Sequence, residues 1–113
     1  MATVVYILTA LKPGVDRDEY ERFEREIDYP FTAKLKTITS YQIHHLTEPV
    51  PFEGGPWDYI EQIEVTDRAA YEAELATSAK DLIELLHNKY LDESKLKFIW
   101  STRIDHECGR KRS

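Results

Sequence analysis

The chain has 113 residues, and 15 Lys and Arg against 21 Asp and Glu give it a formal net charge of −6. This balance argues against a nucleic-acid partner, because such binding needs a basic surface that displaces counterions from phosphates. The length is that of one domain, and seven Tyr, four Phe and two Trp within a 42% hydrophobic composition suffice for one core. A chain this short buries only about two-thirds of its unfolded surface, which favours self-association as a homodimer.

The apolar run at residues 4–11 is too short to span a bilayer, and no basic segment precedes it as in a signal peptide. We therefore expect a cytoplasmic protein without membrane contact. Cys108 is the single cysteine, so no internal disulfide can form, which is typical of a reducing compartment. We expect one domain at residues 1–105 and a C-terminal tail at residues 106–113, where a short basic run is typical of a solvated end.

The first half of the chain predicts a strand, a helix and a second strand. Residues 3–11 are rich in β-branched side chains and end at a Pro-Gly pair. Asp16 and Glu19 have the spacing of a capping box at the start of a helix, and Pro30 restrains the end of that helix. Residues 37–46 predict the second strand. The helix face predicted to meet the core carries apolar side chains at three- and four-residue steps: Tyr20, Phe23, Ile27 and Phe31.

The second half predicts a loop, a strand, a broken helix and a last strand. Residues 47–56 form a surface loop because they hold three Pro and two Gly. Residues 57–65 alternate in type and predict the third strand. Residues 68–90 are helical in pattern, with a break at Thr77-Ser78, and residues 96–104 predict the fourth strand. The third-strand side chains predicted to face the helices are Trp57, Tyr59, Glu61, Ile63 and Val65.

The element order βαββαβ predicts an α+β, ferredoxin-like sandwich. Such a fold has a four-stranded antiparallel sheet with both helices on one face. The other face is then left to pair with a second copy of the chain. A monomer with one solvated sheet face is the alternative.

Two carboxylic acids are candidates for proton transfer. Glu61 is predicted among apolar side chains, and a carboxyl group removed from water has a raised pKa suited to acid–base work. The alternative is a Glu61 that pairs with an Arg or Tyr and only ties strands together. Asp28 lies at the predicted helix end, where the helix dipole disfavours a carboxylate. Orienting a substrate N–H or a Tyr would explain its place, and so would a turn before Pro30.

His44 and His45 are adjacent in a strand, so one faces each side of the sheet. We take His44 as a candidate proton carrier, with a hydrogen-bonded structural role as the alternative. The adjacent pair cannot converge on one ion, and we expect no metal site. The sequence has no Gly-rich phosphate loop, nucleophile elbow or CxxC pair, so we expect no cofactor.

Aromatic residues on four predicted strands favour a flat slot for a small indole- or pyrrole-type substrate, with the loop before Trp57 as its lid. Ordinary core packing is the alternative. The predicted slot consists of Tyr6, Tyr41, Trp57, Tyr59 and Trp100. His106 and Cys108 would join a cavity only if the tail crosses to a second subunit, and an exposed, unperturbed thiol is the alternative.

Short motifs run in a fixed order along the chain at residues 12–16 (KPGVD), 19–21 (EYE), 28–30 (DYP), 40–41 (SY) and 57–61 (WDYIE). Together they resemble the REDY-like (HapK-type) family of the dimeric α/β-barrel superfamily. The resemblance implies a homodimer that acts as a cofactor-independent cyclase or tailoring enzyme in bacterial prodiginine- or bisindole-type secondary metabolism.

On this interpretation the catalytic candidates are Glu61, Asp28, His44 and Tyr59. The substrate-binding candidates are Tyr6, Tyr29, Tyr41, Trp57 and Trp100. Two other classes of function stay open at this point. One is a non-catalytic binding or carrier protein for an aromatic intermediate, and the other is a cofactor-free monooxygenase of the same fold.

Overall fold

The sheet has four antiparallel strands in the order β2-β3-β1-β4. They are β1 (Thr3–Thr9), β2 (Ile38–His45), β3 (Tyr59–Val65) and β4 (Lys97–Thr102). This is a computed structural model, and it describes residues 2–48, 53 and 55–104. The observed order of elements confirms the predicted ferredoxin-like α+β fold.

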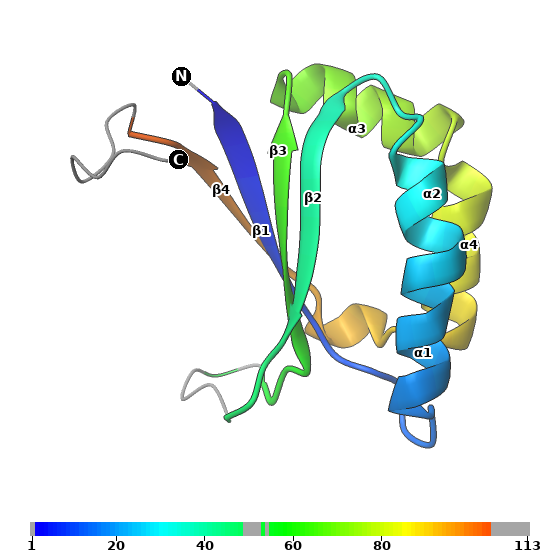
Figure 1. Cartoon of the computed structure of the whole chain (residues 1–113). Helices are drawn as coiled ribbons and strands as arrows, with labels where there is room; N and C mark the ends of the chain where they lie inside the picture. The colour runs from blue at the N-terminus through cyan, green and yellow to red at the C-terminus, as the bar shows by residue number, and fades with distance from the viewer. Residues whose placement is uncertain (1, 49–52, 54, 105–113) are drawn as a thin grey trace, which may run out of the picture.

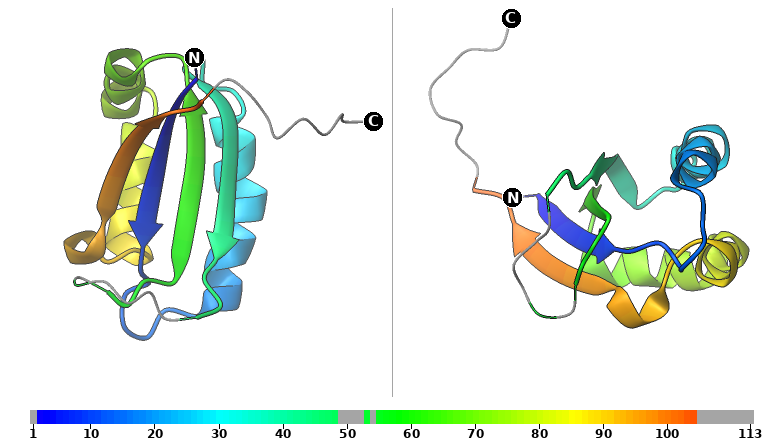
Figure 2. Two further views of the ribbon diagram at one scale, coloured as in Figure 1. Left: turned by 90° about the vertical axis from the view of Figure 1, so that its left-hand side faces the viewer. Right: turned by 90° about the horizontal axis from the view of Figure 1, so that it is seen from below.

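All the long helical segments lie on one side of the sheet (Figure 1). α1 (Arg17–Phe23), the π-helical η1 (Glu24–Asp28) and α2 (Tyr29–Thr32) form one continuous column beside α4 (Lys80–Lys89). α3 (Arg68–Thr77) crosses one end of the sheet, and the 3₁₀ turn η2 (Glu93–Lys95) leads into β4. The separation of α3 from α4 confirms the predicted helix break. In Figure 2, left, the sheet stands in front of the helices and presents its open face.

None of the helices in the described part of the chain is long and apolar enough to cross a membrane.

Strand pairing fixes which side chains meet the helices. Along β3 the buried positions alternate with half-buried ones, and Glu61 lies opposite Ile7 on β1 and Ile43 on β2. The face toward the helices therefore carries Tyr59 and Glu61, as the alternation predicts. The main apolar cluster on that face consists of Val5, Ile7, Ile63, Val65 and Tyr71.

Trp57 does not follow this alternation, and its predicted place on the helix face is wrong. β3 begins only at Tyr59, after a bend at Asp58. The Asp58 backbone forms hydrogen bonds with Thr9 and Leu46, and its carboxylate accepts one from the Leu11 N–H. Trp57 is buried against Leu8 and Ala10, which point to the opposite face. The bend interrupts the two-residue period and turns the indole away from Glu61.

The first helix also differs from its prediction at both ends. Asp16 precedes α1 but its side chain makes no capping hydrogen bond. Pro30 lies inside the helical column, which continues to Thr32. A proline in a regular α-helix clashes with the carbonyl four residues earlier. Here a π turn comes directly before it, with the Tyr29 N–H donating to the Glu24 carbonyl, and this wider turn accommodates the ring.

Candidate functional site

A polar stripe on the helical column faces the sheet. The stripe residues recur every fourth position and are all buried: Tyr20, Glu24, Asp28 and Thr32. The predicted apolar face is correct at Tyr20 but wrong at Ile27, whose side chain is 49% exposed. The helix therefore brings two carboxylic acids into the interface between its column and the sheet.

Tyr41 on β2 joins this stripe to the sheet. Its hydroxyl oxygen lies 2.8 Å from Asp28 Oδ2 and 2.9 Å from Glu61 Oε1. On the other side of Asp28, the Thr32 hydroxyl donates to Oδ1 at 2.9 Å. One phenol thus links a helix carboxyl group to a strand carboxyl group.

The hydrogen count at this link requires a further proton. A tyrosine hydroxyl has one proton to donate, and two ionised carboxylates beside it would both need one. When Tyr41 donates to one of the two carboxyl groups, the other can donate to the phenol oxygen only if it is protonated. Below the pKa of Glu61, the distances therefore allow these groups to share one carboxylic proton.

Burial gives these groups unusual proton affinities. It raises the pKa of Glu61 to about 7, with the hydrogen bond from Tyr41 opposing the rise and the nearby Asp28 charge adding to it. Burial likewise raises the pKa of Glu24 to about 11, with Asp28 contributing. The pKa of Tyr41 is raised well above its usual value, again by burial and then by Glu61. Glu61 is thus the member of the cluster that titrates near neutral pH.

The cluster forms one wall of a cavity of about 130 Å³ between the helices and the sheet. Asp28, Thr32, Tyr41 and Glu61 supply its polar wall, and His87 brings an imidazole from α4. Aliphatic side chains make up most of the rest, among them Ile7, Leu35, Ile38, Ile63, Leu75, Leu82 and Leu86. Apolar cavities of about 150 Å³ bind benzene, so this space has the size for one small ring.

The cavity continues into a broader groove between α3, α4 and the edge strand β4. The groove has a volume of about 590 Å³ and shares four lining residues with the cavity: Tyr71, Leu75, Ile83 and Phe98. Trp100 lies in this groove, edge-on to Tyr71 and beneath the Arg68 guanidinium at 4.6 Å. A molecule bound in the cavity can therefore extend along an aromatic surface outside it.

The structure brings together Glu61, Asp28 and Tyr41 from the predicted site, but not the other catalytic candidates. His44 is exposed on the open face, because it pairs with Ile60 and not with a helix-facing residue. The Tyr59 hydroxyl donates to Glu21 at 2.7 Å, at a separate hollow near the start of α1.

The aromatic residues of the predicted slot lie in separate parts of the structure and do not form a single slot. Tyr6 lies on the open face, Trp57 packs in its own cluster, and Trp100 is in the groove. The Tyr29 ring packs at a tilt against Tyr41, with ring centroids 5.2 Å apart, and its hydroxyl oxygen accepts a hydrogen bond from the Ile43 N–H. Half of the predicted lid, residues 49–52 and 54, lies outside the described residues, and so do His106 and Cys108.

Sequence reasoning missed Glu24, Thr32 and His87. The signal for the first two was the four-residue recurrence of hydrogen-bonding side chains along the helix. His87, whose Nδ1 lies 3.2 Å from Glu93 Oε1, carries no comparable signal because its partner is on a different element. Among residues 2–48, 53 and 55–104, no group of three or more His, Cys, Asp or Glu is arranged to hold a metal ion.

The raised pKa of Glu61 makes stability depend on pH. Between 4.5 and about 7 the folded protein keeps a proton on Glu61 that the unfolded chain has released, so the free energy of unfolding falls as pH rises through this window. Glu61→Gln removes the ionisable group at this position. The free energy of unfolding should then fall less steeply with pH, by about 1.4 kcal/mol per pH unit. Urea unfolding across this window measures the slopes, with the exposed Glu26→Gln as control. Equal slopes in Glu61→Gln and wild type would contradict the assignment.

Removing the Tyr41 hydroxyl should raise the pKa of Glu61 further. The hydrogen bond from Tyr41 favours the ionised carboxylate, and a bond to a charged group is worth enough to move a pKa by about one or more. Carbon-13 NMR titration of the glutamate carboxyl groups in Tyr41→Phe measures this. Tyr6→Phe on the open face is the matched control. A Glu61 pKa unchanged in Tyr41→Phe would show that the phenol does not donate to Glu61.

Comparison with known proteins identifies the family and the fold of this chain. The family described as REDY-like protein HapK matches residues 3–104. HapK from Hahella chejuensis is similar in structure, with a TM-score of 0.74 and 19% identity over 98% of this chain and 100% of HapK.

More distant structures share the fold. The EthD family protein of Bacillus halodurans has a TM-score of 0.61 at 12% identity over 92% of this chain and 100% of its own. A protein of Thermobifida fusca described as dimeric and ferredoxin-like has a TM-score of 0.64 at 10% identity over 90% of this chain and 92% of its own. No protein with a curated description matches the sequence. The family match spans nearly the whole described chain, and this protein belongs to the REDY-like HapK family.

Proposed function

We propose that this protein is a cofactor-independent acid–base enzyme, a cyclase or related tailoring enzyme of bacterial aromatic secondary metabolism. The observation that carries the proposal is the phenol of Tyr41 held between the carboxyl groups of Asp28 and Glu61. Membership of the HapK family supports the prodiginine- or bisindole-type setting. The ring-sized cavity beside the cluster supports a small aromatic substrate.

The cluster can both give and take a proton in one reaction. Protonated Glu61 donates to a carbonyl oxygen or imine nitrogen of the substrate as the new ring bond forms. The Asp28 carboxyl group accepts the proton that the attacking ring position releases. Transfer through the Tyr41 hydroxyl then returns the proton to Glu61, so the protein ends in its starting state.

The test uses the organism that carries the gene. Deletion should change its aromatic metabolites, the exposed control Glu26→Gln should restore them, and Glu61→Gln should not, because losing an acid–base group costs about a hundredfold or more in rate. Restoration by Glu61→Gln would remove the proposed proton-transfer role. Leu82→Trp fills the cavity. If Glu61→Gln restores the metabolites and Leu82→Trp does not, the protein is a binding or carrier protein for an aromatic intermediate.

The open sheet face supports a homodimer as the working form. Structures of this fold from Bacteroides fragilis and Thermobifida fusca are described as dimeric. In this chain the open face carries Ile99, which pairs with Tyr6 and is 45% exposed. A second copy on this face would remove that apolar surface from water.

A charge on that face should weaken the dimer. Ile99→Glu would bury an unpaired carboxylate between the two sheets and should raise the dimer dissociation constant about tenfold or more. Leu85→Glu is the matched control, because Leu85 is similarly exposed, at 43%, but lies on α4. Sedimentation velocity measures both variants. Equal association by Ile99→Glu and wild type would place the dimer contact elsewhere or remove it.

A further inference from the structure

A second hollow reaches the polar stripe from the opposite edge of the sheet. It has a volume of about 190 Å³ and lies between α1 and the edge strand β2. Two of its lining residues, Tyr20 and Glu24, are members of the buried stripe, and it does not share a residue with the ring-sized cavity. The acidic cluster therefore lies between two separate spaces.

The two stripe residues at this hollow have polar atoms without partners. Glu24 is 4% exposed and Tyr20 fully buried, yet Glu24 Oε2 and the Tyr20 hydroxyl have no hydrogen-bond partner among the described residues. A buried polar atom left without a partner costs about 1–3 kcal/mol, so such atoms point to water or to a function. The reaction described above uses neither group.

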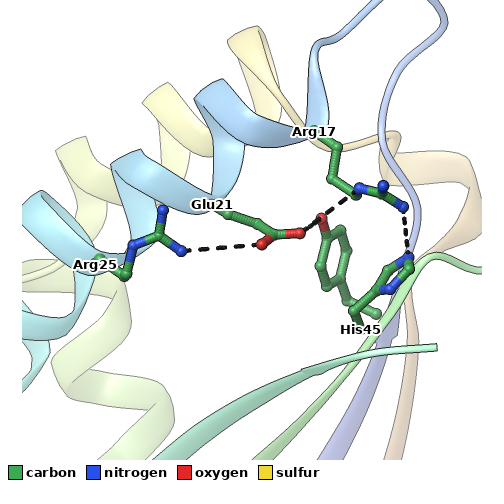
Figure 3. Close-up of polar contacts among 5 residues, drawn as sticks. Arg17, Glu21, Arg25 and His45 are labelled. Carbon is green, nitrogen blue, oxygen red and sulfur yellow. Dashed lines mark hydrogen bonds and ion pairs between the residues drawn. The ribbon is translucent and has the colours of Figure 1, made fainter. Parts of the chain in front are cut away.

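Charged and polar side chains line the hollow, among them Glu21, Arg25 and His45, and Figure 3 shows the contacts that join them to Arg17. Glu21 lies between Arg17 and Arg25, with N–O distances of 3.9 Å to each, and Arg17 contacts His45 Nε2 at 3.0 Å. These side chains are half-buried or exposed, unlike the aliphatic walls of the cavity. The polar and charged lining, rather than the size of the hollow, favours water as its occupant.

We propose that this hollow is a proton entrance to the acidic cluster, and that Glu24 carries protons between water in the hollow and Asp28. The use of this route in catalysis rests on the proposed function. The return through Tyr41 closes the reaction, and Glu24 exchanges the protons of the cluster with solvent. Protonated Glu24 passes its proton to water in the hollow as it takes one from Asp28, and the reverse transfer leaves each group as it was. The substrate enters and leaves by the groove on the other side.

The charges around Glu24 fit this role. Asp28 follows it by one turn of the column, and Tyr20 precedes it by one turn. From the sheet, Glu61 and Tyr41 face the same interior, while Tyr59 and His45 line the hollow. Burial, Asp28 and Glu61 together raise the pKa of Glu24, so its carboxyl group is protonated at neutral pH and can release a proton only as it receives another. A substrate that fills the apolar cavity would block water from that side and leave Glu24 as the remaining exchange path.

The experiment measures proton exchange directly and needs no substrate. Protein at about pH 6 is mixed with D2O, and the infrared carbonyl band of protonated Glu61 is followed as it shifts. The band is assigned by its loss in Glu61→Gln. In Glu24→Gln the exchange should slow about tenfold or more, because an amide cannot pass the proton on. Ile43→Trp keeps Glu24 but fills the hollow, and it should slow exchange as well.

Glu26→Gln is the matched control, because it lies in the same π turn but is exposed, and it should exchange at the wild-type rate. Backbone amide exchange, unchanged in each variant, excludes general loosening of the fold. If Glu24→Gln does not fold, Ile43→Trp decides alone. Wild-type exchange rates in these variants would overturn the route. Slowed exchange in a protein without enzymatic activity would retain the route and reject the proposed function.

Discussion

The hydrogen bonds that Tyr41 makes with Asp28 and Glu61 are the constraint on which the interior of this protein depends. They connect the helical column to the sheet through groups that an apolar interface would otherwise exclude. Two ionised carboxylates there would repel each other with little water to screen them, and an unpaired buried charge costs several kcal/mol. A proton on Glu61 avoids this cost below its pKa. Burial is what raises that pKa to about 7, with the Asp28 charge adding to it, so the pH dependence of stability and the proposed chemistry have one origin.

The π turn at Glu24–Asp28 makes the polar stripe possible. An α-helix advances 100° per residue, so side chains four apart drift by about 40° at each step and would leave one face within three steps. A π turn holds more residues and takes back part of that drift. Tyr20, Glu24, Asp28 and Thr32 consequently stay in line against the sheet. Pro30 and the distorted turn before it are thus tied to the placement of the carboxyl groups.

The parts of the structure that follow from local pattern could be predicted from sequence. Strand alternation placed Glu61 toward the helices, and Thr77-Ser78 marked the break between α3 and α4. The two interpretations of Glu61, a proton-transfer group or a partner of Tyr, proved compatible, since Tyr41 bonds to it while burial raises its pKa. Its catalytic role stays a prediction. Glu24 and Thr32 were missed because a hydrophobic pattern assigns polar side chains to the surface, whereas both are buried in the folded protein. Trp57 was misplaced because a single bend at Asp58 reverses the face.

The fold itself accommodates many activities, so function depends on the sites that this chain builds on it. The groove that continues the cavity lies at β4, and the polar hollow lies at β2, which are the two edge strands. Within one protomer these two spaces lie on opposite sides of the acidic cluster. Substrate and protons could then reach the same three residues from opposite sides without competing for one entrance. This separation matters for a reaction that moves protons at a ring, because an apolar cavity orders the substrate best when water is kept out of it. The polar hollow then supplies the water contact that the cavity lacks.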